Sequence, residues 1–423
     1  MSEIERFDIT SGLQMVDGVG VSKSTMPESV EDVADILRAA NERGEVVIPW
    51  GGGTLMGLGN IPEAADVGLD LTRLNQIVSY EPDDMTIAVQ AGCRIGELIA
   101  ALAEQGQMLP FEVACPAEAT LGGLYAAGIS GPRRFGHGSM RDLVIGITSM
   151  SPSGEVARGG GMVVKNVSGY DMMRLHYGAL GSLGVVLQLN FKVLPRPRAQ
   201  RTVVMRYAGI DAAIDAALTV RDSQLAPTAI VLLDDGGARV AGLGEGPWTL
   251  LMRAEGPSEA AAQQTTRLQV AATNGALDRE VFEDEATETV WAAANASLSA
   301  EPETSGIVVR IGLPPSRASE IVNAVIRIAD EYTVRRALSV DFGNGLLFAR
   351  FGGNDEQVLE LRSLWQSLRS IGAHATLLAA PPIVKQELDV YGAEPAGFGL
   401  MRALKQQFDP KRTLNRGRFI GCL

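Results

Sequence analysis

Residues 45–54 read Glu-Val-Val-Ile-Pro-Trp-Gly-Gly-Gly-Thr, a short apolar run followed at once by three glycines and a threonine. The apolar run predicts a buried strand. Glycines let the backbone approach a ligand and point successive N–H groups at an anion, and the threonine hydroxyl adds a donor. The segment is neither a G-x-G-x-x-G fingerprint, because Met56 occupies the third glycine position, nor a P-loop, because no Lys-Ser/Thr pair follows Gly57. It predicts an anion-binding loop, with a mobile surface turn as the alternative.

Four further loops of small residues follow, at 116–123, 126–134, 138–144 and 178–186. Loop 126–134 carries two arginines, and the loops together hold few charges. Neutral backbone donors can hold phosphates without a desolvated cation. Five such loops in this order favour a long, flat, diphosphate-containing cofactor that is buried along its length.

The composition excludes several classes of protein. The 423 residues include 48 glycines, where an average composition gives about 30. A net charge of −13 leaves no basic surface for nucleic acid. Three histidines argue against a His-rich metal centre, and three separated cysteines, Cys93, Cys115 and Cys422, are too few for an iron–sulfur cluster held by this chain alone. Without a signal peptide or an apolar run of about 18 residues, the protein is expected to be cytoplasmic, with no transmembrane segment.

The second half of the chain, residues 200–375, repeats a plan of strand, helix, hairpin, helix and strand. The first copy has a predicted turn at 235–237, and the second has Asn-Gly at 344–345, the strongest short hairpin signal. This plan predicts a split βαβ sheet with helices on one face. Residues 194–198, Leu-Pro-Arg-Pro-Arg, are the expected hinge, because two prolines end any regular element.

Two more segments complete a pattern shared with a known family. Lys-Asn-Val-Ser-Gly-Tyr-Asp at 165–171 precedes the last glycine loop, and Phe-Asp-Pro-Lys-Arg-Thr-Leu-Asn stands at 408–415. With the five loops, they resemble the vanillyl-alcohol-oxidase type of FAD-dependent oxidoreductase. Residues 130–142 carry a finer resemblance, to the FAD-binding E subunit of bacterial glycolate oxidase. The resemblance is strong over about 45–200, returns at 408–423 and is weak between.

The resemblance implies an α+β fold with a two-part PCMH-type FAD-binding domain and a split-βαβ (ferredoxin-like) cap domain. We expect the FAD-binding domain at 1–198, the cap at 199–378 and a C-terminal segment at 379–423 that returns to the FAD domain. The resemblance places Gly51, Gly52, Gly53 and Thr54 at the pyrophosphate of FAD, with Pro49 and Trp50 beside them. It places Pro116, Thr120, Gly122 and Gly123 along the ribityl chain and flavin, and Ser130, Gly138 and Asp142 near the flavin or diphosphate. Val185 and Val186 are expected at the adenine side, and Asn415 near the isoalloxazine ring.

Three features of the family are missing. Covalent members bond the flavin through a histidine or cysteine, but no histidine lies near 51–54 and Cys115 is expected to be a buried structural thiol, so we expect non-covalent FAD. Catalytic 2-hydroxyacid members have a His-rich metal motif in the cap, whereas the corresponding hairpin at 339–345, Ser-Val-Asp-Phe-Gly-Asn-Gly, has no histidine. They also tend to have Gly-Ser-Glu-Gly where this chain has Gly-Ala-Leu-Gly at 178–181. We therefore expect no metal, and no base for abstracting a proton from an α-hydroxy acid.

The three histidines each have a structural interpretation. His137 lies between two glycines and is expected near the flavin or an arginine. His176 is expected to be packed or to cap a helix, and His374 to lie on the surface. The sequence therefore assigns no catalytic residue.

Other charged and polar candidates also have two interpretations. Arg133 and Arg134 suit an anionic substrate or an FAD phosphate, and a salt bridge with Asp142 or with a partner subunit is an equal alternative. Tyr170 and Asp171 form either an active-site pair or a buried tyrosine–carboxylate hydrogen bond.

Three functional hypotheses follow. The first is a non-covalent FAD-binding subunit of a glycolate or related 2-hydroxyacid oxidase, which relays electrons or acts as a scaffold between a catalytic FAD subunit and an iron–sulfur subunit. Such a complex also allows peripheral association with the cytoplasmic membrane. The second is a self-sufficient FAD-dependent dehydrogenase for glycolate or D-lactate. The third is an assembly subunit whose FAD is structural.

Overall fold

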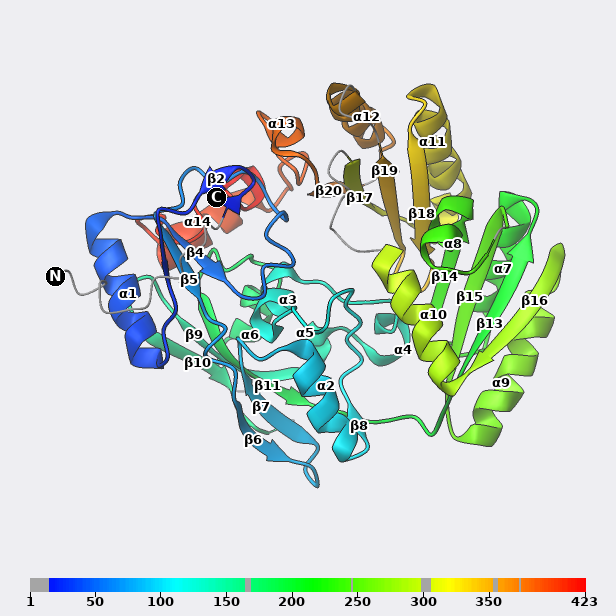
Figure 1. Ribbon diagram of the computed structural model, residues 1–423, viewed down its shortest axis with the longest axis horizontal. Coiled ribbons are helices and arrows are strands. Elements are labelled where there is room, and N and C mark those ends of the chain that lie inside the picture. The colour runs from blue at the N-terminus through cyan, green and yellow to red at the C-terminus, as the bar shows by residue number, and fades with distance from the viewer. Residues whose placement is uncertain (1–14, 164–168, 245, 298–305, 353–356, 373) are drawn as a thin grey trace.

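The structure is a computed structural model that describes residues 15–163, 169–244, 246–297, 306–352, 357–372 and 374–423. Figure 1 shows two halves side by side. The N-terminal elements and the last helix of the chain form one half, and the strands and helices between residues 199 and 379 form the other. The chain is therefore α+β, as predicted, with the hinge segment running between the halves.

A small parallel sheet opens the first half, and the first glycine loop follows directly from its edge strand. The sheet has the order β3-β5-β4 and packs on helix α1. Ser29 and Asp32 form a capping box at the start of α1, and Gly44 ends it at φ 72°, a conformation that favours glycine. The elements are β3 (Lys23–Thr25), α1 (Val30–Arg43), β4 (Val47–Trp50) and β5 (Val67–Asp70), preceded by the two-residue pair β1 (Met15–Val16) and β2 (Val19–Gly20).

An antiparallel sheet of five strands, in the order β10-β9-β11-β7-β6, forms the rest of this half. Its core is closed by short helices that bring the second and third glycine loops toward the first. The strands are β6 (Ile77–Glu81), β7 (Thr86–Gln90), β9 (Val144–Met150), β10 (Val156–Gly160) and β11 (Val185–Lys192), and β8 (Gln107–Met108) pairs separately with β12 (Leu194–Pro195). The helices are α2 (Ile95–Glu104), α3 (Leu121–Ala127), α4 (Arg134–His137), α5 (Met140–Leu143) and α6 (Met172–His176).

The second half is one antiparallel sheet of eight strands in the order β16-β13-β15-β14-β18-β19-β17-β20. Each half of that order is a split βαβ unit, and the two units join where β14 pairs with β18, so the predicted repeat is confirmed. The first unit is β13 (Ala199–Tyr207), α7 (Ile210–Arg221), β14 (Ala229–Asp234), β15 (Trp248–Gly256), α9 (Ser258–Ala271) and β16 (Ala276–Glu283). The second is β17 (Gly306–Gly312), α11 (Ala318–Glu331), β18 (Arg335–Asp341), β19 (Leu346–Gly352), α12 (Val358–Arg369) and β20 (Ala375–Ala379).

One predicted turn is a helix instead. Residues 235–237 begin α8 (Asp235–Val240), because the side chain of Asp234 accepts a hydrogen bond from the N–H of Gly237 and caps the helix. The predicted hairpin at 344–345 does form between β18 and β19.

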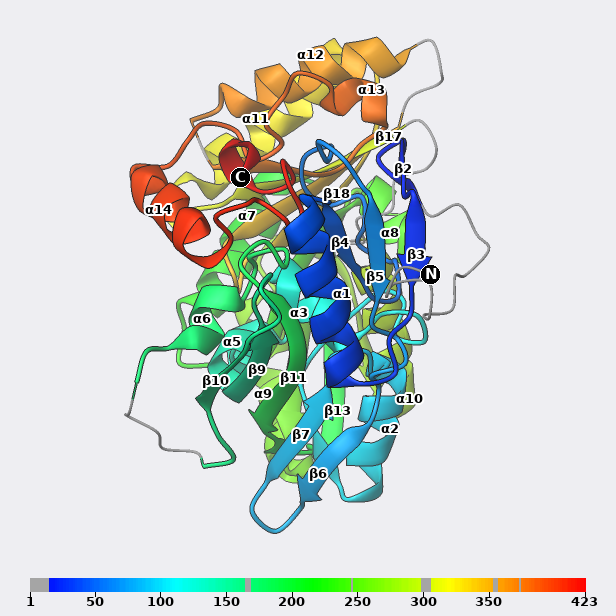
Figure 2. The same cartoon turned by 90° about the vertical axis from the view of Figure 1, so that its left-hand side faces the viewer.

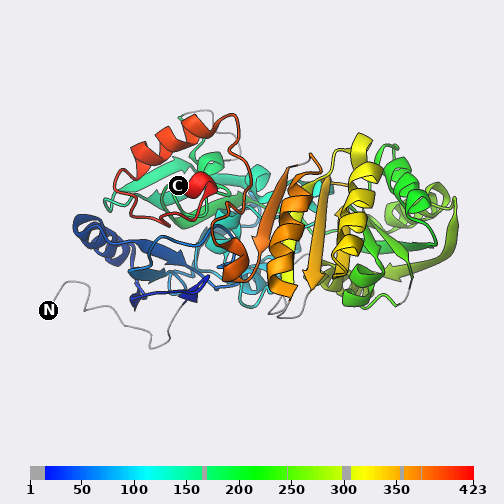
Figure 3. The same ribbon diagram turned by 90° about the horizontal axis from the view of Figure 1, so that it is seen from above.

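Helices cover both faces of the eight-stranded sheet, so the prediction of helices on one face is wrong. Helices α7, α9, α11 and α12 cover one face over the largest core, and Figure 3 shows α11 and α12 lying across it. Helices α8 and α10 (Asp284–Ser297) cover part of the other face, and the uncovered remainder of that face looks toward the first half. In the described part of the chain, no helix has both the length and the hydropathy required to cross a lipid bilayer.

The C-terminal segment returns to the first half, where Figure 2 shows α14 (Phe398–Phe408) and the C-terminus on the same side as α1. Leu414 bridges to Val47 of β4, and the N–H of Asn415 donates to the carbonyl of Val47. Three buried cations from α13 (Pro382–Lys385), α14 and the tail donate to carbonyl oxygens of the glycine loops. The acceptors are Gly57 and Gly59 for Lys385, Ser182 for Lys405, and Met56 and Leu58 for Arg418.

A buried set of charges joins the two halves. This interdomain ion cluster consists of Glu112, Arg133, Arg253, Glu255 and Glu288. The guanidinium of Arg253 is fully buried and lies 2.9 Å from Glu112, 3.1 Å from Glu255 and 3.2 Å from Glu288. Burial alone would raise the pKa of Glu255, but a hydrogen bond with His137 and the charges of Arg133 and Arg253 lower it to about 2.

Removal of Arg253 is expected to destabilise the protein strongly. The substitution Arg253→Met leaves buried carboxylates without their shared cation, which costs about 3–5 kcal/mol in comparable pairs. The matched control is Arg239→Met, because Arg239 forms only an exposed pair with Asp235, worth less than about 1 kcal/mol. Urea unfolding of the two variants measures the difference, and equal free energies of unfolding would contradict a stabilising role for the cluster.

Candidate functional site

Two neighbouring cavities contain most of the residues assigned to the cofactor. The glycine groove is a narrow cavity of about 70 Å³ between the end of β4, the start of α3 and the start of β11. Leu180 lines both the groove and a larger cavity, which is described below. Eight of the predicted cofactor residues line the groove: Pro49, Trp50, Gly51, Thr120, Gly122, Gly123, Val185 and Val186.

The first glycine loop offers backbone donors that the protein itself does not use. In the described structure, none of the N–H groups of residues 51–54 donates to a protein atom. Successive free N–H groups of this kind form an anion-binding nest. A Cβ added at Gly51 would lie 2.2 Å from Oγ1 of Thr120, and one added at Gly52 would lie 1.7 Å from the carbonyl oxygen of Glu118. The loop therefore fits a phosphate held by backbone, and only glycine allows the two loops to approach so closely.

The other predicted cofactor residues are more scattered. Gly52 and Gly53 continue the loop beside the groove, Thr54 and Ser130 line the larger cavity, and Pro116 lines a neighbouring cleft. Asn415 is buried, and its Nδ2 donates to the carbonyl of Leu180.

Gly138 and Asp142 line neither the groove nor the larger cavity. Asp142 accepts hydrogen bonds from the N–H and hydroxyl of Ser139 in a capping box, and Gly138 packs against it. The carboxylate of Asp142 is therefore already used in hydrogen bonds at the start of α5.

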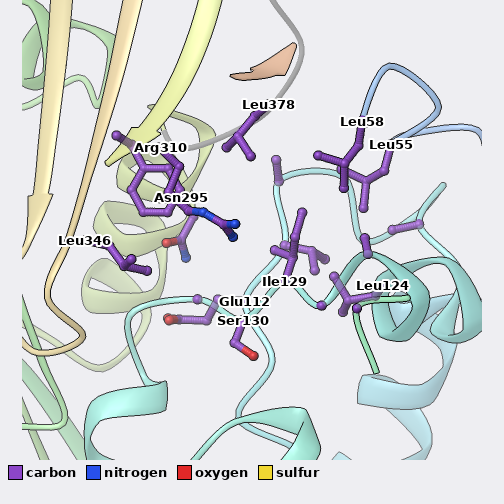
Figure 4. A pocket seen from close by; sticks show the side chains of 18 of the residues that line it. Leu55, Leu58, Glu112, Leu124, Ile129, Ser130, Asn295, Arg310, Leu346 and Leu378 are labelled. Atoms are coloured by element: carbon purple, nitrogen blue, oxygen red, sulfur yellow. The ribbon is translucent and has the colours of Figure 1, made fainter. Parts of the chain in front are cut away.

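The larger cavity lies between the two halves and is called the interdomain cavity. It measures about 290 Å³ and is formed by loops of the first half and by β17, β19 and β20 of the second. Figure 4 shows Arg310 and Asn295 pointing into it, while Leu55, Leu58 and Leu124 face them from the first half. Four charged side chains line it, namely Glu112, Arg134, Arg310 and Asp341.

Arg310 is the deepest cation of the interdomain cavity. It lies on β17, where its register partners are Phe348 on β19 and Thr376 on β20. No carboxylate of the described residues forms an ion pair with it, and burial lowers its pKa while Tyr391 and Tyr177 raise it. A partly buried guanidinium without an ion-pair partner suits an anionic ligand.

Unpartnered polar atoms near Arg310 point to the same conclusion. Thr376 is 1% exposed and Asn295 is 7% exposed, and both line the cavity. The Thr376 hydroxyl and the Asn295 Oδ1 are buried without a hydrogen-bond partner. Buried polar groups are normally hydrogen-bonded, so these atoms are expected to be satisfied by a ligand.

Asp341 is the acid–base group of the cavity. It ends β18, it is buried, and its oxygens accept hydrogen bonds from the N–H and side-chain amide of Asn344 at 3.0 and 2.7 Å. Burial raises its pKa to about 7, helped by the negative charge of Glu112 and opposed by the Asn344 hydrogen bonds. A carboxylate with this pKa can accept a proton at neutral pH. The hairpin at 339–345, from which no base was expected because it has no histidine, thus places a carboxyl group of raised pKa at the cavity.

The histidines lie outside the interdomain cavity. His137 contacts Glu255 at 2.8 Å beside Arg133, close to the arginine expected for it. His176 is buried against Phe408, and burial lowers its pKa to about 4, while His374 is exposed. Among the described residues, no group of three or more His, Cys, Asp or Glu side chains is arranged to hold a metal ion.

Two pairs suggested by the sequence do not form. Tyr170 is 91% exposed and Asp171 instead caps α6 through the N–H of Arg174, so they are neither an active-site pair nor a buried pair. Arg133 pairs with Glu255 and not with Asp142. Residues 165–168 of the motif at 165–171 lie outside the described residues.

Sequence reasoning missed Arg310, Thr376 and Asp341, although Arg310 and Asp341 each left a signal. Arg310 is the single charged residue in the strand Gly306–Gly312, which is otherwise apolar, and a charge there requires a functional or ionic partner. Asp341 was noted only as part of a hairpin without histidine. Thr376 gave no signal, because a threonine in a strand is ordinary.

Substitution of Gly52 is expected to weaken FAD binding, FAD being the cofactor that the resemblance implies. In Gly52→Ala the new methyl group overlaps the carbonyl of Glu118, and the loop has to shift. Overpacking of about 1–3 kcal/mol corresponds to a loss of roughly tenfold or more in affinity. Gly57→Ala is the control in the same loop, because nothing lies within 4 Å of its Cβ position. Flavin fluorescence titration measures both, and an unchanged affinity in Gly52→Ala would contradict this role of the loop.

Comparison with known proteins agrees with this geometry. Residues 24–160 match the family described as FAD binding domain, and residues 196–370 and 385–419 match FAD linked oxidases, C-terminal domain. Glycolate oxidase subunit GlcD of Bacillus subtilis (strain 168) is 25% identical over 419 residues, which cover 93% of this chain and 88% of that protein. Glycolate oxidase subunit GlcE of Escherichia coli (strain K12) is 46% identical over 132 residues, 31% of this chain and 38% of that protein.

The fold is also found among solved structures. The structure of p-cresol methylhydroxylase with substrate bound has a TM-score of 0.76 to this chain at 16% identity, and the match covers 95% of this chain and 89% of that one. An identity this low establishes the fold alone. The two family matches together span most of the chain, which therefore belongs to the FAD-linked oxidases with a PCMH-type FAD-binding domain, the family of glycolate, D-lactate and D-2-hydroxyglutarate dehydrogenases, and is an FAD-dependent oxidoreductase.

Proposed function

We propose that this chain oxidises a 2-hydroxy acid to the 2-oxo acid in the interdomain cavity. The observation that carries the proposal is the presence, in one cavity, of the partly buried Arg310 guanidinium, without an ion-pair partner among the described residues, and of the buried Asp341 carboxyl, whose pKa is raised to about 7. Arg310 suits the carboxylate of the substrate, and Asp341 suits its hydroxyl proton. The two side chains lie on the same face of the sheet, on strands β17 and β18 that are separated by β19.

Different residues of the cavity have different roles in the proposed reaction. The Arg310 guanidinium and the Thr376 hydroxyl bind the substrate carboxylate, while Asp341 accepts the proton of the α-hydroxyl as that O–H bond breaks. The glycine groove and the N–H groups of residues 51–54 would hold FAD, which would supply the two-electron acceptor needed for loss of the α-carbon hydrogen and formation of the carbonyl. Apolar side chains of the cavity, including Leu55, Leu346 and Leu378, exclude water from these groups.

Asp341→Asn is expected to reduce kcat/KM by roughly 100-fold or more, because the amide accepts no proton. In the unsubstituted protein, kcat/KM is expected to rise with pH through about 7, since only the deprotonated carboxylate acts as the base. The measurement is flavin bleaching by glycolate or D-lactate under anaerobic conditions, across pH, at equal FAD content. Asp330→Asn is the control, because Asp330 is exposed and pairs with Arg336. No bleaching by any 2-hydroxy acid would overturn the proposal.

A second candidate function is a subunit role in a multi-chain glycolate or 2-hydroxyacid oxidase. The observation that favours it is the identity of 46% to glycolate oxidase subunit GlcE over 132 residues. In this role the chain holds FAD without a covalent bond and works in the cytoplasm, or at the inner face of the membrane through the complex. It relays electrons or acts as a scaffold between a catalytic FAD subunit and an iron–sulfur subunit. A variant of this role, an assembly subunit with structural FAD, requires no electron transfer.

Purification of the chain from its natural source under gentle conditions tests the second candidate. We expect co-purifying chains that carry FAD and iron–sulfur absorbance, together with glycolate-dependent dye reduction that the isolated chain lacks. Gly52→Ala then separates relay from structural FAD: assembly lost with unchanged turnover per assembled complex indicates structural FAD. A single chain that bleaches its own flavin with full activity would contradict the subunit role.

A further inference from the structure

One peptide group of the first half is hydrogen-bonded on both sides beside the interdomain cavity. It joins Pro132 to Arg133. Its N–H donates to Oε2 of Glu112 at 2.9 Å, and its carbonyl oxygen, that of Pro132, accepts from Nδ2 of Asn344 at 3.3 Å. Glu112 belongs to the interdomain ion cluster, and Asn344 lies in the turn between β18 and β19. A single planar group therefore connects that cluster to the turn that follows Asp341.

Asn344 bonds to both halves of the molecule through its side-chain amide. An amide nitrogen carries two N–H groups. Nδ2 of Asn344 has an acceptor for each of them, the carbonyl of Pro132 in the first half and Oδ2 of Asp341 in the cap, the latter at 2.7 Å. The backbone N–H of Asn344 also donates to Oδ1 of Asp341 at 3.0 Å. The two acceptors fix the plane of the amide, and the amide in turn fixes the carboxylate.

The carboxylate of Asp341 keeps acceptor sites for a further donor. A carboxylate offers about four lone-pair sites, and the bonds from Asn344 use two of them. Because both oxygens are held, the group cannot rotate freely, and the remaining sites keep a fixed direction. Asp341 is 3% exposed and lines the interdomain cavity. The hydroxyl of a 2-hydroxy acid bound in this cavity is a donor of the required kind.

The turn that contains Asn344 packs closely against the first half. A Cβ added at Gly343 would lie 2.7 Å from Cβ of Phe135 in α4, so a side chain at this position would force the two apart. One alternative is that Asn344 only shapes the turn, because an Asp side chain bonds to nearby backbone in isolated turns as well. The bond to Pro132 distinguishes the two interpretations, since it lies outside the turn.

Three charged side chains line the cavity together with Asp341. Glu112 and Arg134 come from the first half, and Arg310 comes from β17. Burial is the largest cause of the raised pKa of Asp341, and the charge of Glu112 raises it further. The hydrogen bonds from Asn344 and the charge of Arg134 lower the same pKa. These groups act in opposite directions, so the loss of each has an effect of known sign.

We propose that Asn344 is a positioning residue, which orients the Asp341 carboxylate toward the substrate hydroxyl and takes its own orientation from the peptide group between Pro132 and Arg133. The inference rests on the proposed 2-hydroxyacid oxidation and adds how the base of that reaction is held. The base has its working geometry only while the cap is docked, because the peptide group that fixes Asn344 belongs to the other half of the molecule.

The first test compares the FAD-loaded full chain with its Asn344→Ala variant, through kcat/KM for glycolate and D-lactate across pH. We expect the pH midpoint of Asn344→Ala to lie about one pH unit higher, because the lost bond favours the charged carboxylate. At high pH a loss of about tenfold remains, because the carboxylate is no longer oriented. Asn344→Ser keeps one donor and restores part of the shift. A role in the turn alone would lower kcat/KM equally at every pH and leave the midpoint unchanged.

The matched control is Asn323→Ala, because the amide of Asn323 donates to Ser319 on the surface of α11. We expect no change in its midpoint or in kcat/KM. A shift in this variant equal to that of Asn344→Ala would contradict a specific role for Asn344.

Glu112→Gln is expected to shift the midpoint in the other direction, to lower pH. The substitution removes a negative charge that raises the pKa of Asp341, while the amide oxygen still accepts the N–H of Arg133. Opposite shifts in Glu112→Gln and Asn344→Ala do not arise from a general loosening of the cap. An upward shift in both variants would indicate such loosening and count against the proposal.

Infrared titration separates this inference from the proposed function. The carbonyl stretch of protonated Asp341, identified by its absence in Asp341→Asn, reports the protonation of this group without any substrate. An unchanged infrared midpoint in Asn344→Ala overturns the positioning role even if the protein oxidises 2-hydroxy acids. If no 2-hydroxy acid reduces the flavin, the proposed function fails, and the role of Asn344 in catalysis fails with it, whatever the infrared midpoint.

Discussion

The cofactor loops hold their shape because buried cations behind them take up their carbonyl oxygens. Lys385, Lys405 and Arg418 come from the last forty residues, yet they donate to loops more than two hundred positions away in sequence. These bonds tie the tail to residues 56–59, which follow the first glycine loop, and to Ser182, while the N–H groups of residues 51–54 donate to no described residue. The returning tail is therefore part of the binding site, although Asn415 is the only tail residue that the resemblance assigned to the cofactor.

Buried charges also hold the two halves of the molecule together beside the interdomain cavity. The interdomain ion cluster joins Glu112 and Arg133 of the first half to β15 and α10 of the cap, through Arg253, Glu255 and Glu288. Three carboxylates face two guanidiniums there, so each cation of the cluster has ion-pair partners. A few residues away, Arg310 is left without a counter-ion in a protein whose net charge is −13. An imbalance in that position costs stability, and a bound anion offsets the cost.

The glycine loops and the duplicated strand–helix plan could be predicted from sequence because both are local signals. A loop such as 51–54 is recognised from its glycine content, and the strand–helix periodicity recurs within about thirty residues. The interdomain cavity depends on non-local facts instead. Arg310 and Asp341 lie on one face because β19 pairs with both β17 and β18, and the cavity forms only where the cap meets loops of the first half. Asp142 was expected near the flavin or diphosphate because of its motif. In the structure, its carboxylate forms the capping box of α5.

The cofactor groove offers mainly backbone groups, whereas the interdomain cavity offers side chains. The two sites can therefore change independently during evolution. The groove binds through N–H groups and close glycine contacts, so most side chains around it are free to change, which fits a shared fold with p-cresol methylhydroxylase at 16% identity. In the proposed reaction, recognition of the substrate falls instead to side chains of the cap sheet, each placed by strand register. A single substitution at a position such as Arg310, Thr376 or Asp341 alters the charge of the cavity without disturbing the groove. New substrates are therefore expected to arise in the cap while the cofactor stays the same.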